Sequence, residues 1–237
     1  AISGFALEAS ALGRPDVGLT SFGEMLDRGF RIASAVDIPV IVDGETGFGG
    51  PIQVARTIKD LERAGLAGIH IEDQVSPKKC GSLLTKSVIP VPEAVAKIKA
   101  AVDARTDPDF IIIARTDADV ISFDAVVERC NLFLEAGADV AFPINAAWRK
   151  EGPARLAEIT KLLPKQINGP VMIGSIDLAE MTVADAQAAG VKIATYFSFA
   201  LFAATQAMME AANELKKAGI PSGYFDRHPG ISQDEFF

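Results

Sequence analysis

Short runs of uniformly apolar residues recur along the whole 237-residue chain, and longer amphipathic segments separate them. Six of these runs are expected to form strands, at 39–43, 68–73, 110–116, 139–144, 170–175 and 191–197. Strands without polar alternation are typical of a parallel sheet whose two faces are both covered. The pattern therefore predicts an α/β protein built from repeated strand–helix units.

The segments between these runs have the apolar spacing of helices. They lie at 22–36, 51–64, 92–104, 123–136, 153–163, 183–189 and 198–218. Pro51, Pro92 and Pro153 stand at the first turns of three of them, where proline is tolerated. No linker, low-complexity segment or shift in composition divides the chain, so we predict a single domain over residues 1–237.

Polar residues follow the ends of the expected strands, among them Asp43, Glu72, Arg115 and Asn145. In a (β/α)8 barrel these ends meet at one mouth, whereas in an open sheet only the ends beside the switch point meet. The strand ends therefore favour a TIM-type barrel. Six strands are clear and the first residues, AIS, suit the tail of a seventh, so we expect the first strand and helix, about 40 residues, to precede Ala1.

The net charge of −8 argues against a nucleic-acid partner or an anionic membrane, because both are bound through clusters of Lys and Arg. The longest apolar stretch, around 193–204, is shorter than the roughly 20 residues of a membrane span. Cys80 and Cys130 are too few for a disulfide framework, and the N-terminal residues lack the basic start of a signal peptide. We therefore expect a cytoplasmic protein without a membrane partner.

Two carboxylates, Asp43 and Glu45, lie in the segment VDGETGFGG directly after an expected strand, and Glu72 ends the next one. Three converging carboxylates repel one another unless a cation lies among them. Hard oxygen ligands suit Mg2+, with Mn2+ as the alternative ion. Ion pairs within the chain are the competing interpretation.

The connection at 75–89 is long for a strand–helix loop, and long loops at a barrel mouth are often lids. Cys80 follows Lys78 and Lys79, whose charges are expected to lower the pKa of the thiol. Without ligand we expect this loop to be open and mobile. A solvated basic turn with a neutral cysteine is the alternative, whereas Cys130 has the spacing of a core residue.

Arg115 and His70 are the other candidates for the mouth of the barrel. A buried guanidinium needs an anion, which is either a substrate carboxylate or Glu72. His70 faces the same side of its strand as Glu72, two residues later, so it either touches the site or is a hydrogen-bonded core residue. We expect Cys80, Lys78, Arg115 and His70 to form the catalytic group.

Five segments in order resemble the isocitrate lyase and phosphoenolpyruvate mutase superfamily, with methylisocitrate lyase-like and carboxyphosphonoenolpyruvate mutase-like members as the nearest patterns. They are SGFALEASALGRPDVGLTS, PVIVDGETGFGG, AGLAGIHIEDQVSPKKCG, DPDFIIIARTDA and EAGADVAFP, and they span residues 3–143. The combination of EDQ with KKCG is specific. Beyond residue 143 the likeness is one of pattern only.

This resemblance implies a (β/α)8 barrel, Mg2+ and an α-oxyacid substrate that passes through an enolate-like state. By position, Asp16, Asp43, Glu45 and Glu72 would hold Mg2+ directly or through water, and Cys80 would protonate the departing carbanion. Three residues, Ser3, Gly4 and Arg115, would bind the carboxylate end of the substrate, and Asn145 its distal part.

The chain departs from the family pattern at three of these positions. Ser82 stands where lyases commonly have His, Glu45 where Asp is usual, and Asn145 where lyases of isocitrate-type substrates have Glu. The metal-binding half of the site is therefore expected to be intact and the distal half altered, which argues against a tricarboxylic substrate.

We therefore predict a Mg2+-dependent carbon–carbon lyase of a 2-hydroxy or 2-oxo di- or tricarboxylic acid. Two alternatives stay open: decarboxylation of oxaloacetate or cleavage of a P–C bond within the same superfamily, and a non-catalytic barrel that binds a small acid. We also predict a homo-oligomer, as a tetramer, partly from the resemblance and partly because helix 198–218 is apolar on more than one face.

Overall fold

The computed structural model describes residues 1–230 and divides the chain into two units, Ala1–Phe197 and a second unit that starts at Ser198. In the first unit, four parallel strands pair in chain order: β1 (Ile41–Asp43), β2 (Gly68–Glu72), β3 (Ile111–Thr116) and β4 (Val140–Pro143). A parallel pair, β5 (Met172–Gly174) and β6 (Ile193–Thr195), follows. All six expected strands are confirmed, each with shorter bounds.

Two isolated bridges extend this parallel order at both sides of the four-stranded sheet. Ile2 pairs with Val42 of β1, and Ala141 of β4 pairs with Val171 just before β5. The first residues therefore lie beside β1, as the sequence predicted. Within residues 1–230, no described pairing joins β6 back to Ile2, so the strands form an α/β sheet in barrel order without hydrogen bonds that close it.

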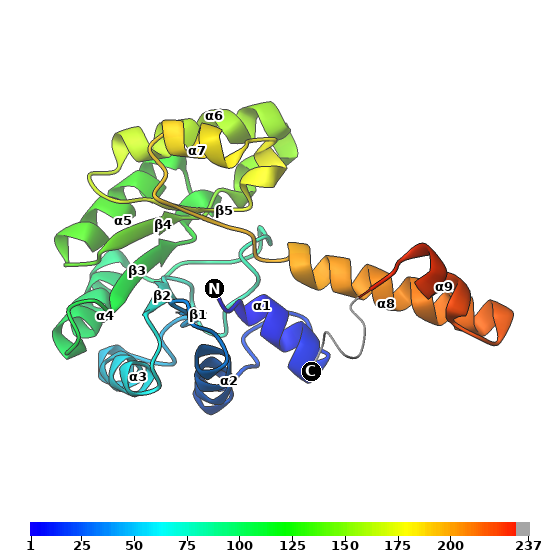
Figure 1. Cartoon of the computed structure of the whole chain (residues 1–237). Coiled ribbons are helices and arrows are strands. Elements are labelled where there is room, and N and C mark those ends of the chain that lie inside the picture. The colour runs from blue at the N-terminus through cyan, green and yellow to red at the C-terminus, as the bar shows by residue number, and fades with distance from the viewer. Residues whose placement is uncertain (231–237) are drawn as a thin grey trace. The chain divides into compact units, whose positions relative to one another are not determined.

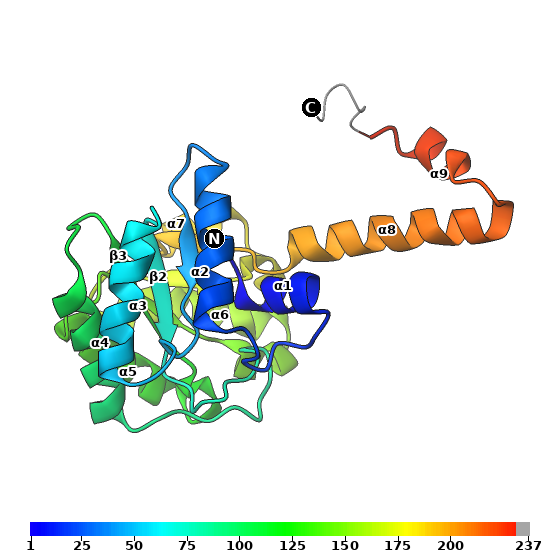
Figure 2. The same ribbon diagram turned by 90° about the horizontal axis from the view of Figure 1, so that it is seen from below.

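Six helices of the first unit follow the strands in alternation: α2 (Phe22–Ser34), α3 (Pro51–Arg63), α4 (Val91–Ala104), α5 (Phe123–Glu135), α6 (Pro153–Gln166) and α7 (Val183–Ala188). Helices α2 to α6 lie around the outer side of the strands (Figure 1), and Figure 2 shows α2 and α3 side by side beside β2. On α3, Val54, Ile58 and Leu61 are fully buried, which is the spacing of one helix face. These helices are where the sequence predicted them.

The period of two along the strands separates the core from the site. On β3, Ile112 and Ala114 belong to the core beneath the helices, whereas Ile113 belongs to a second cluster with Phe142 and Met172. Because side chains alternate along a strand, Arg115 at the end of β3 shares the face of Ile113. The inner face is therefore apolar at its base and charged at the carboxyl ends of the strands.

Several short elements were not predicted from the sequence, among them the 3-10 turns Ala118–Val120, Ala146–Glu151 and Ile176–Ala179. The chain starts with a four-residue helix, α1 (Gly4–Leu7), which continues as a π-helical turn, η1 (Glu8–Leu12). The second unit holds α8 (Phe199–Ala218), which was predicted, and α9 (Ser222–Arg227), which was not. Among residues 1–230, no helix has the length and apolar content needed to cross a membrane.

Candidate active site

The carboxylates of Asp43, Glu45 and Glu72 lie at the carboxyl ends of β1 and β2 and are 5%, 3% and 2% exposed. Asp43 ends its strand, and the chain then turns through Glu45, whose φ of 50° is in the left-handed region. The Glu45 N–H donates to Asp43 Oδ1 at 3.0 Å, so the turn folds around the Asp43 carboxylate. The strand end and the turn therefore fix two acids beside each other.

Gly4, which the resemblance assigned with Ser3 to the substrate carboxylate, packs against this pair. The Gly4 N–H donates to Asp43 Oδ2 at 3.0 Å, and a Cβ on Gly4 would collide with Glu45 Oε1. Ser3 caps α1 by accepting from the N–H of Ala6 at 3.4 Å. Only glycine leaves room for two carboxylates at this distance from the backbone.

Lys78 reaches into the same group from the loop that follows β2. Its ammonium pairs with Asp16 and, at 2.8 Å, with Glu45 Oε2, and the residue is 4% exposed. Burial alone would lower the pKa of Lys78, but the surrounding carboxylates, Asp43 and Glu72 foremost, raise it. Lys78 therefore stays charged and balances part of the negative charge of the site.

Glu8 is a member of the site that the sequence did not reveal. Ligand atoms of Glu8, Asp16 and Glu45 lie within 4.8 Å of one another, and all three residues are buried. Glu8 also accepts from the backbone N–H groups of residues 17, 19 and 20, at 2.9, 2.7 and 3.0 Å. We therefore assign Glu8 to holding the loop that presents Asp16, a role that depends on the turn and has no signature in the sequence.

The buried carboxylates suit a divalent cation. Among the described residues, both oxygens of Glu45 and of Glu72 lack a hydrogen-bond partner, although one oxygen of each lies beside a cation. Burial and then Asp43 raise the pKa of Glu45 to about 8, and burial raises that of Glu72 well above its usual value. Desolvated carboxylates of this kind gain from a hard cation, and an all-oxygen donor set suits Mg2+.

Arg115 has the anionic partner that its position required. Its Nη1 lies 2.9 Å from Glu72 Oε2, while Nε and Nη2 donate to the two oxygens of Asp117 at 2.9 and 3.1 Å. The guanidinium also lies over the ring of Phe142, 5.8 Å from its centroid. Arg115 therefore pairs with Glu72, one of the two expected anions, and also with Asp117, which was not expected.

His70 belongs to the site and not to the outer core. Its Nδ1 is 3.5 Å from Asp43 Oδ1, and its ring meets Phe142 edge-on with centroids 5.7 Å apart. Burial lowers the pKa of His70, so the ring is neutral at pH 7. Burial alone would raise the pKa of Asp43, yet the positive charges of His70 in its protonated form, Lys78 and Arg115 lower it.

The expected effect of the lysines on Cys80 is wrong. Burial and then the charge of Asp16 raise the pKa of the Cys80 thiol, although hydrogen bonds from Ser82 oppose this. Lys78 is already paired with carboxylates, and Lys79 donates to the carbonyl of Thr85 at 2.8 Å. Cys80 is therefore a protonated thiol at pH 7, which suits a proton donor better than a nucleophile.

The loop at 75–89 has polar contacts that hold it in this structure, and its mobility without ligand stays a prediction. The Cys80 N–H donates to the Asp16 carbonyl at 3.0 Å, and Gln74 exchanges hydrogen bonds of 2.9 and 3.0 Å with the backbone of Lys79. The sequence suggested few anchors for this loop because residues 75–89 include few large apolar side chains. The anchors are polar, and they place the loop over the carboxylates.

The family described as phosphoenolpyruvate phosphomutase matches residues 1–216 of this chain. The chain belongs to this family. The resemblance inferred from the sequence motifs is therefore confirmed, together with an enzyme of the isocitrate lyase and phosphoenolpyruvate mutase superfamily and an α/β fold of its barrel type.

Several named relatives of this family member are lyases. This chain is 38% identical to the 2,3-dimethylmalate lyase of Eubacterium barkeri, over 95% of this chain and 76% of that relative. It is 47% identical to the 2-methylisocitrate lyase of Shewanella oneidensis over 142 residues, which are 60% of this chain and 49% of that relative. The chain thus spans about half the length of some curated relatives that it matches.

Solved structures agree with this assignment. A phosphonopyruvate hydrolase, described as a complex with oxalate and Mg++, matches with a TM-score of 0.84 and 30% identity over 99% of this chain and 79% of that one. The relatives thus act on small carboxylic acids and cleave C–C or P–C bonds.

The residues that were expected to form the altered distal half of the site contact other parts of the chain. The amide of Asn145 donates to Thr160 on α6 at 3.4 Å, and Ser82 accepts a hydrogen bond of 2.9 Å from Nη1 of Arg149. Arg149 Nε is buried and lacks a hydrogen-bond partner among the described residues. Arg149 was not predicted from the sequence, although its position six residues after β4, near Asn145, was a signal.

Proposed function

We propose that this chain is the catalytic barrel of a Mg2+-dependent carbon–carbon lyase that acts on a 2-hydroxy or 2-oxo di- or tricarboxylic acid. The observation that supports this most is the group of buried carboxylates, Asp43, Glu45 and Glu72, beneath a loop that presents a protonated cysteine. The lyases among the relatives support the same class of reaction.

In this proposal Asp43, Glu45, Glu72 and Asp16 hold Mg2+ directly or through water. When bound, Mg2+ polarises the C2 oxygen of the substrate and so favours cleavage of the adjacent bond. Mn2+ has the same preference for oxygen ligands and is the alternative ion. Lys78 offsets the charge that remains on Asp16 and Glu45.

The carboxylate end of the substrate is bound by Ser3, Gly4 and Arg115 in this proposal. Gly4 lies against the metal-binding acids, and Arg115 is held in a fixed orientation by Asp117. A guanidinium fixed in this way recognises a carboxylate with little loss of entropy. His70 positions Asp43 from the floor of the site.

Cys80 then donates its proton to the carbon that leaves as a carbanion and becomes a thiolate. Its raised pKa keeps the proton in place until negative charge develops on the substrate. The closed loop around Cys80 excludes water that would otherwise compete as the proton donor.

The test is cleavage of 2,3-dimethylmalate, 2-methylisocitrate and isocitrate, each measured with and without EDTA. We expect product from at least one of them and loss of that product with chelator. If none gives a chelator-sensitive product, the lyase proposal is wrong. Calorimetry with Mg2+ and oxalate then distinguishes a barrel that only binds acids from one that binds none.

A second candidate is cleavage of a P–C bond or decarboxylation of oxaloacetate. The neutral Asn145, turned toward α6, favours it, because both reactions need the metal-binding half of the site and not the distal half. Product analysis with phosphonopyruvate and oxaloacetate separates this candidate from the first. Activity that survives Cys80→Ala would also favour it.

Assembly and location belong to the same proposal. We propose a homotetramer in the cytoplasm, as the sequence suggested. None of the residues of α8 is buried, and Met208, Met209 and Leu215 are 64%, 57% and 49% exposed. Light scattering at micromolar concentration tests the assembly, and a monomeric mass would remove it.

A further inference from the structure

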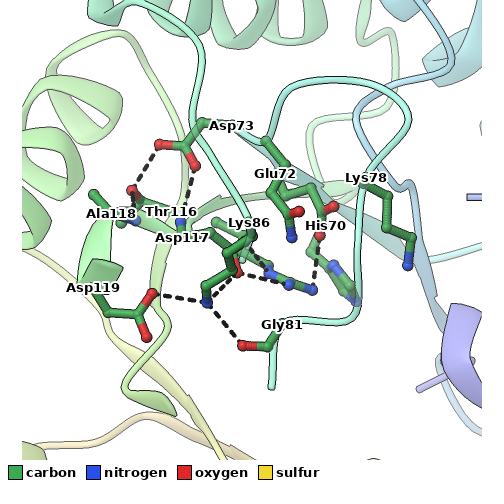
Figure 3. Close-up of polar contacts among 12 residues, drawn as sticks. His70, Glu72, Asp73, Lys78, Gly81, Lys86, Thr116, Asp117, Ala118 and Asp119 are labelled. Atoms are coloured by element: carbon green, nitrogen blue, oxygen red, sulfur yellow. Dashed lines mark hydrogen bonds and ion pairs between the residues drawn. The ribbon is translucent and has the colours of Figure 1, made fainter. Parts of the chain in front are cut away.

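Lys86 lies at the far end of the loop that presents Cys80, and its charged group is buried in the protein. Its side chain is 0% exposed, and Nζ contacts Gly81 O, Asp117 Oδ1 and Asp119 Oδ1, each at 2.8 Å (Figure 3). Two of these contacts are hydrogen bonds, to Gly81 O and Asp117 Oδ1, and the contact with Asp119 is an ion pair. The mechanism proposed above assigns no role to this residue.

The contact with Gly81 joins the two ends of the loop tip. Lys86 donates back across five residues to a carbonyl directly after Cys80, so the segment between them is held as a closed turn. The other two contacts attach this turn to residues that follow β3. Lys86 therefore fixes the position of Gly81 relative to the sheet.

The same contacts reach the substrate end of the site. Asp117, which accepts from Lys86, also accepts both hydrogen bonds from Arg115, and Arg115 pairs with Glu72. Gly81 itself lies on this guanidinium, because a Cβ there would be 2.5 Å from Arg115 Nη2. One continuous polar network thus connects the loop to Arg115 and Glu72.

Asp117, which belongs to this network at the carboxyl edge of the sheet, is also held by contacts that do not involve the loop. The Asp117 N–H donates to Asp73 Oδ1 at 2.9 Å, and the Thr116 hydroxyl donates to Asp73 Oδ2 at 2.7 Å (Figure 3). Asp73 Oδ2 also accepts from Nη1 of Arg129 at 3.0 Å. These contacts come from strands β2 and β3 and helix α5. Loss of the Lys86 contacts would therefore loosen the loop tip at Gly81 and leave the acids in place.

We propose that Lys86 is a positioning residue, a latch that holds Cys80 and Gly81 closed over Arg115 and Glu72. The proposal deepens the lyase function above and rests on it for its effect on turnover. The position of the loop itself can be measured without any substrate. A purely structural ion pair would stabilise the fold without controlling access to Cys80.

The experiment measures alkylation of Cys80 by iodoacetamide in the whole chain, for the wild type and Lys86→Met. Cys130 is an internal reference, because it is fully buried on α5. We expect labelling of Cys80 to become at least about tenfold faster in Lys86→Met, since local opening then costs less free energy. Lys99→Met, at an exposed site on α4, should label like the wild type.

Two further measurements separate positioning from folding and from a change in the thiol. Labelling across a range of pH distinguishes a shift in the pKa of Cys80 from greater access to it. Lys86→Arg should restore slow labelling in part. If Lys86→Met fails to fold, Asp119→Asn removes one of the three contacts, leaves the pairing of Asp117 with Arg115, and should also speed labelling.

Steady-state kinetics complete the test. In Lys86→Met we expect kcat to fall at least about tenfold while binding of oxalate with Mg2+ changes less than about threefold, because the loop acts after ground-state binding. Unchanged labelling of Cys80 in Lys86→Met and in Asp119→Asn would overturn the latch. If the wild type turns over none of the substrates, the proposed function fails while labelling still decides about Lys86.

Discussion

The carboxyl ends of β1 to β3 and those of β4 to β6 face the same side of the sheet, but their chemistry differs. The first three strands end in buried charged groups that contact one another, including Asp43, Glu72 and Arg115. After β4 stands the neutral Asn145, and after β5 stands Ser175 in the left-handed region, with a φ of 55°. In the proposed function, the carboxyl ends of β1 to β3 bind the cation and the α-oxyacid end, and those of β4 to β6 determine what else the substrate contains.

The largest expected effect concerns the carboxyl ends of β1 to β3, which form the charged half of the site. Replacing Asp43 with Ala removes an acid that has hydrogen bonds from Gly4 and Glu45. We expect calorimetry to show Mg2+-dependent oxalate binding weakened by at least about 100-fold, because even indirect partners of metal ligands cost 10–100-fold when removed.

The matched control for Asp43→Ala is Asp177→Ala, which removes the same charge at an exposed position after β5. It should change oxalate binding less than about threefold, as expected for an exposed charge. Equal losses in both variants would show that net charge, and not the group of acids at β1 and β2, binds the ligand.

The second prediction concerns the loop above the charged half. Cys80→Ser should lower kcat by about 10²–10⁴-fold, the usual contribution of a positioned general acid, because serine is a much weaker acid. Oxalate binding with Mg2+ should stay within about threefold, since the thiol acts only when charge develops on the substrate. Parallel loss of both would mean that Cys80 shapes the site and does not transfer a proton.

The third prediction is a pH dependence of cation binding. Burial and Asp43 raise the pKa of Glu45 to about 8, so a proton must leave when a cation binds below that pH. The apparent affinity for Mg2+ with oxalate should therefore rise by at least about tenfold per pH unit between pH 6 and 8, because Glu72, whose pKa is also raised, adds to the release of protons. Lys78, whose pKa is raised, stays charged throughout and adds no titration.

The control for this profile is Glu45→Gln, which has no proton to release. It should bind Mg2+ more weakly, and its affinity should depend less on pH. A wild-type profile that is flat from pH 6 to 9 would show that Glu45 is already ionised without a cation.

The sequence predicted the strands and helices well because their signals are local. Apolar runs mark the strands, and proline at Pro51 and Pro153 marks the first turns of α3 and α6. The charged half was equally accessible, since Asp43 and Glu72 stand directly at strand ends and parallel strands bring those ends together.

What the sequence could not predict depends on contacts between distant segments. Lys86 and Asp117 are 31 residues apart, and neither position has a motif that indicates their pairing. The pKa of Cys80 was predicted in the wrong direction because Lys78, two residues before it, pairs with Asp16 and Glu45. Neighbours in sequence determine charge near a thiol only when their side chains have no stronger partner.

The smallest expected effect tests whether the residues at the carboxyl ends of β4 to β6 bind any part of the substrate. Arg149 donates to Ser82, two residues after Cys80, through Nη1, and its Nε is buried without a hydrogen-bond partner among the described residues. Arg149→Gln should raise KM for a dicarboxylate substrate by about tenfold, the lower end for a hydrogen bond to a charged group. Oxalate is too short to reach beyond the charged half, so its binding should change less than about twofold by the same reasoning.

Arg155→Gln on α6, where the side chain pairs with Glu158 in solvent, is the matched control and should alter neither value. A loss of oxalate binding in Arg149→Gln would show that this arginine belongs to the charged half. An unchanged KM would show that residues other than Arg149 bind the second carboxylate of the substrate.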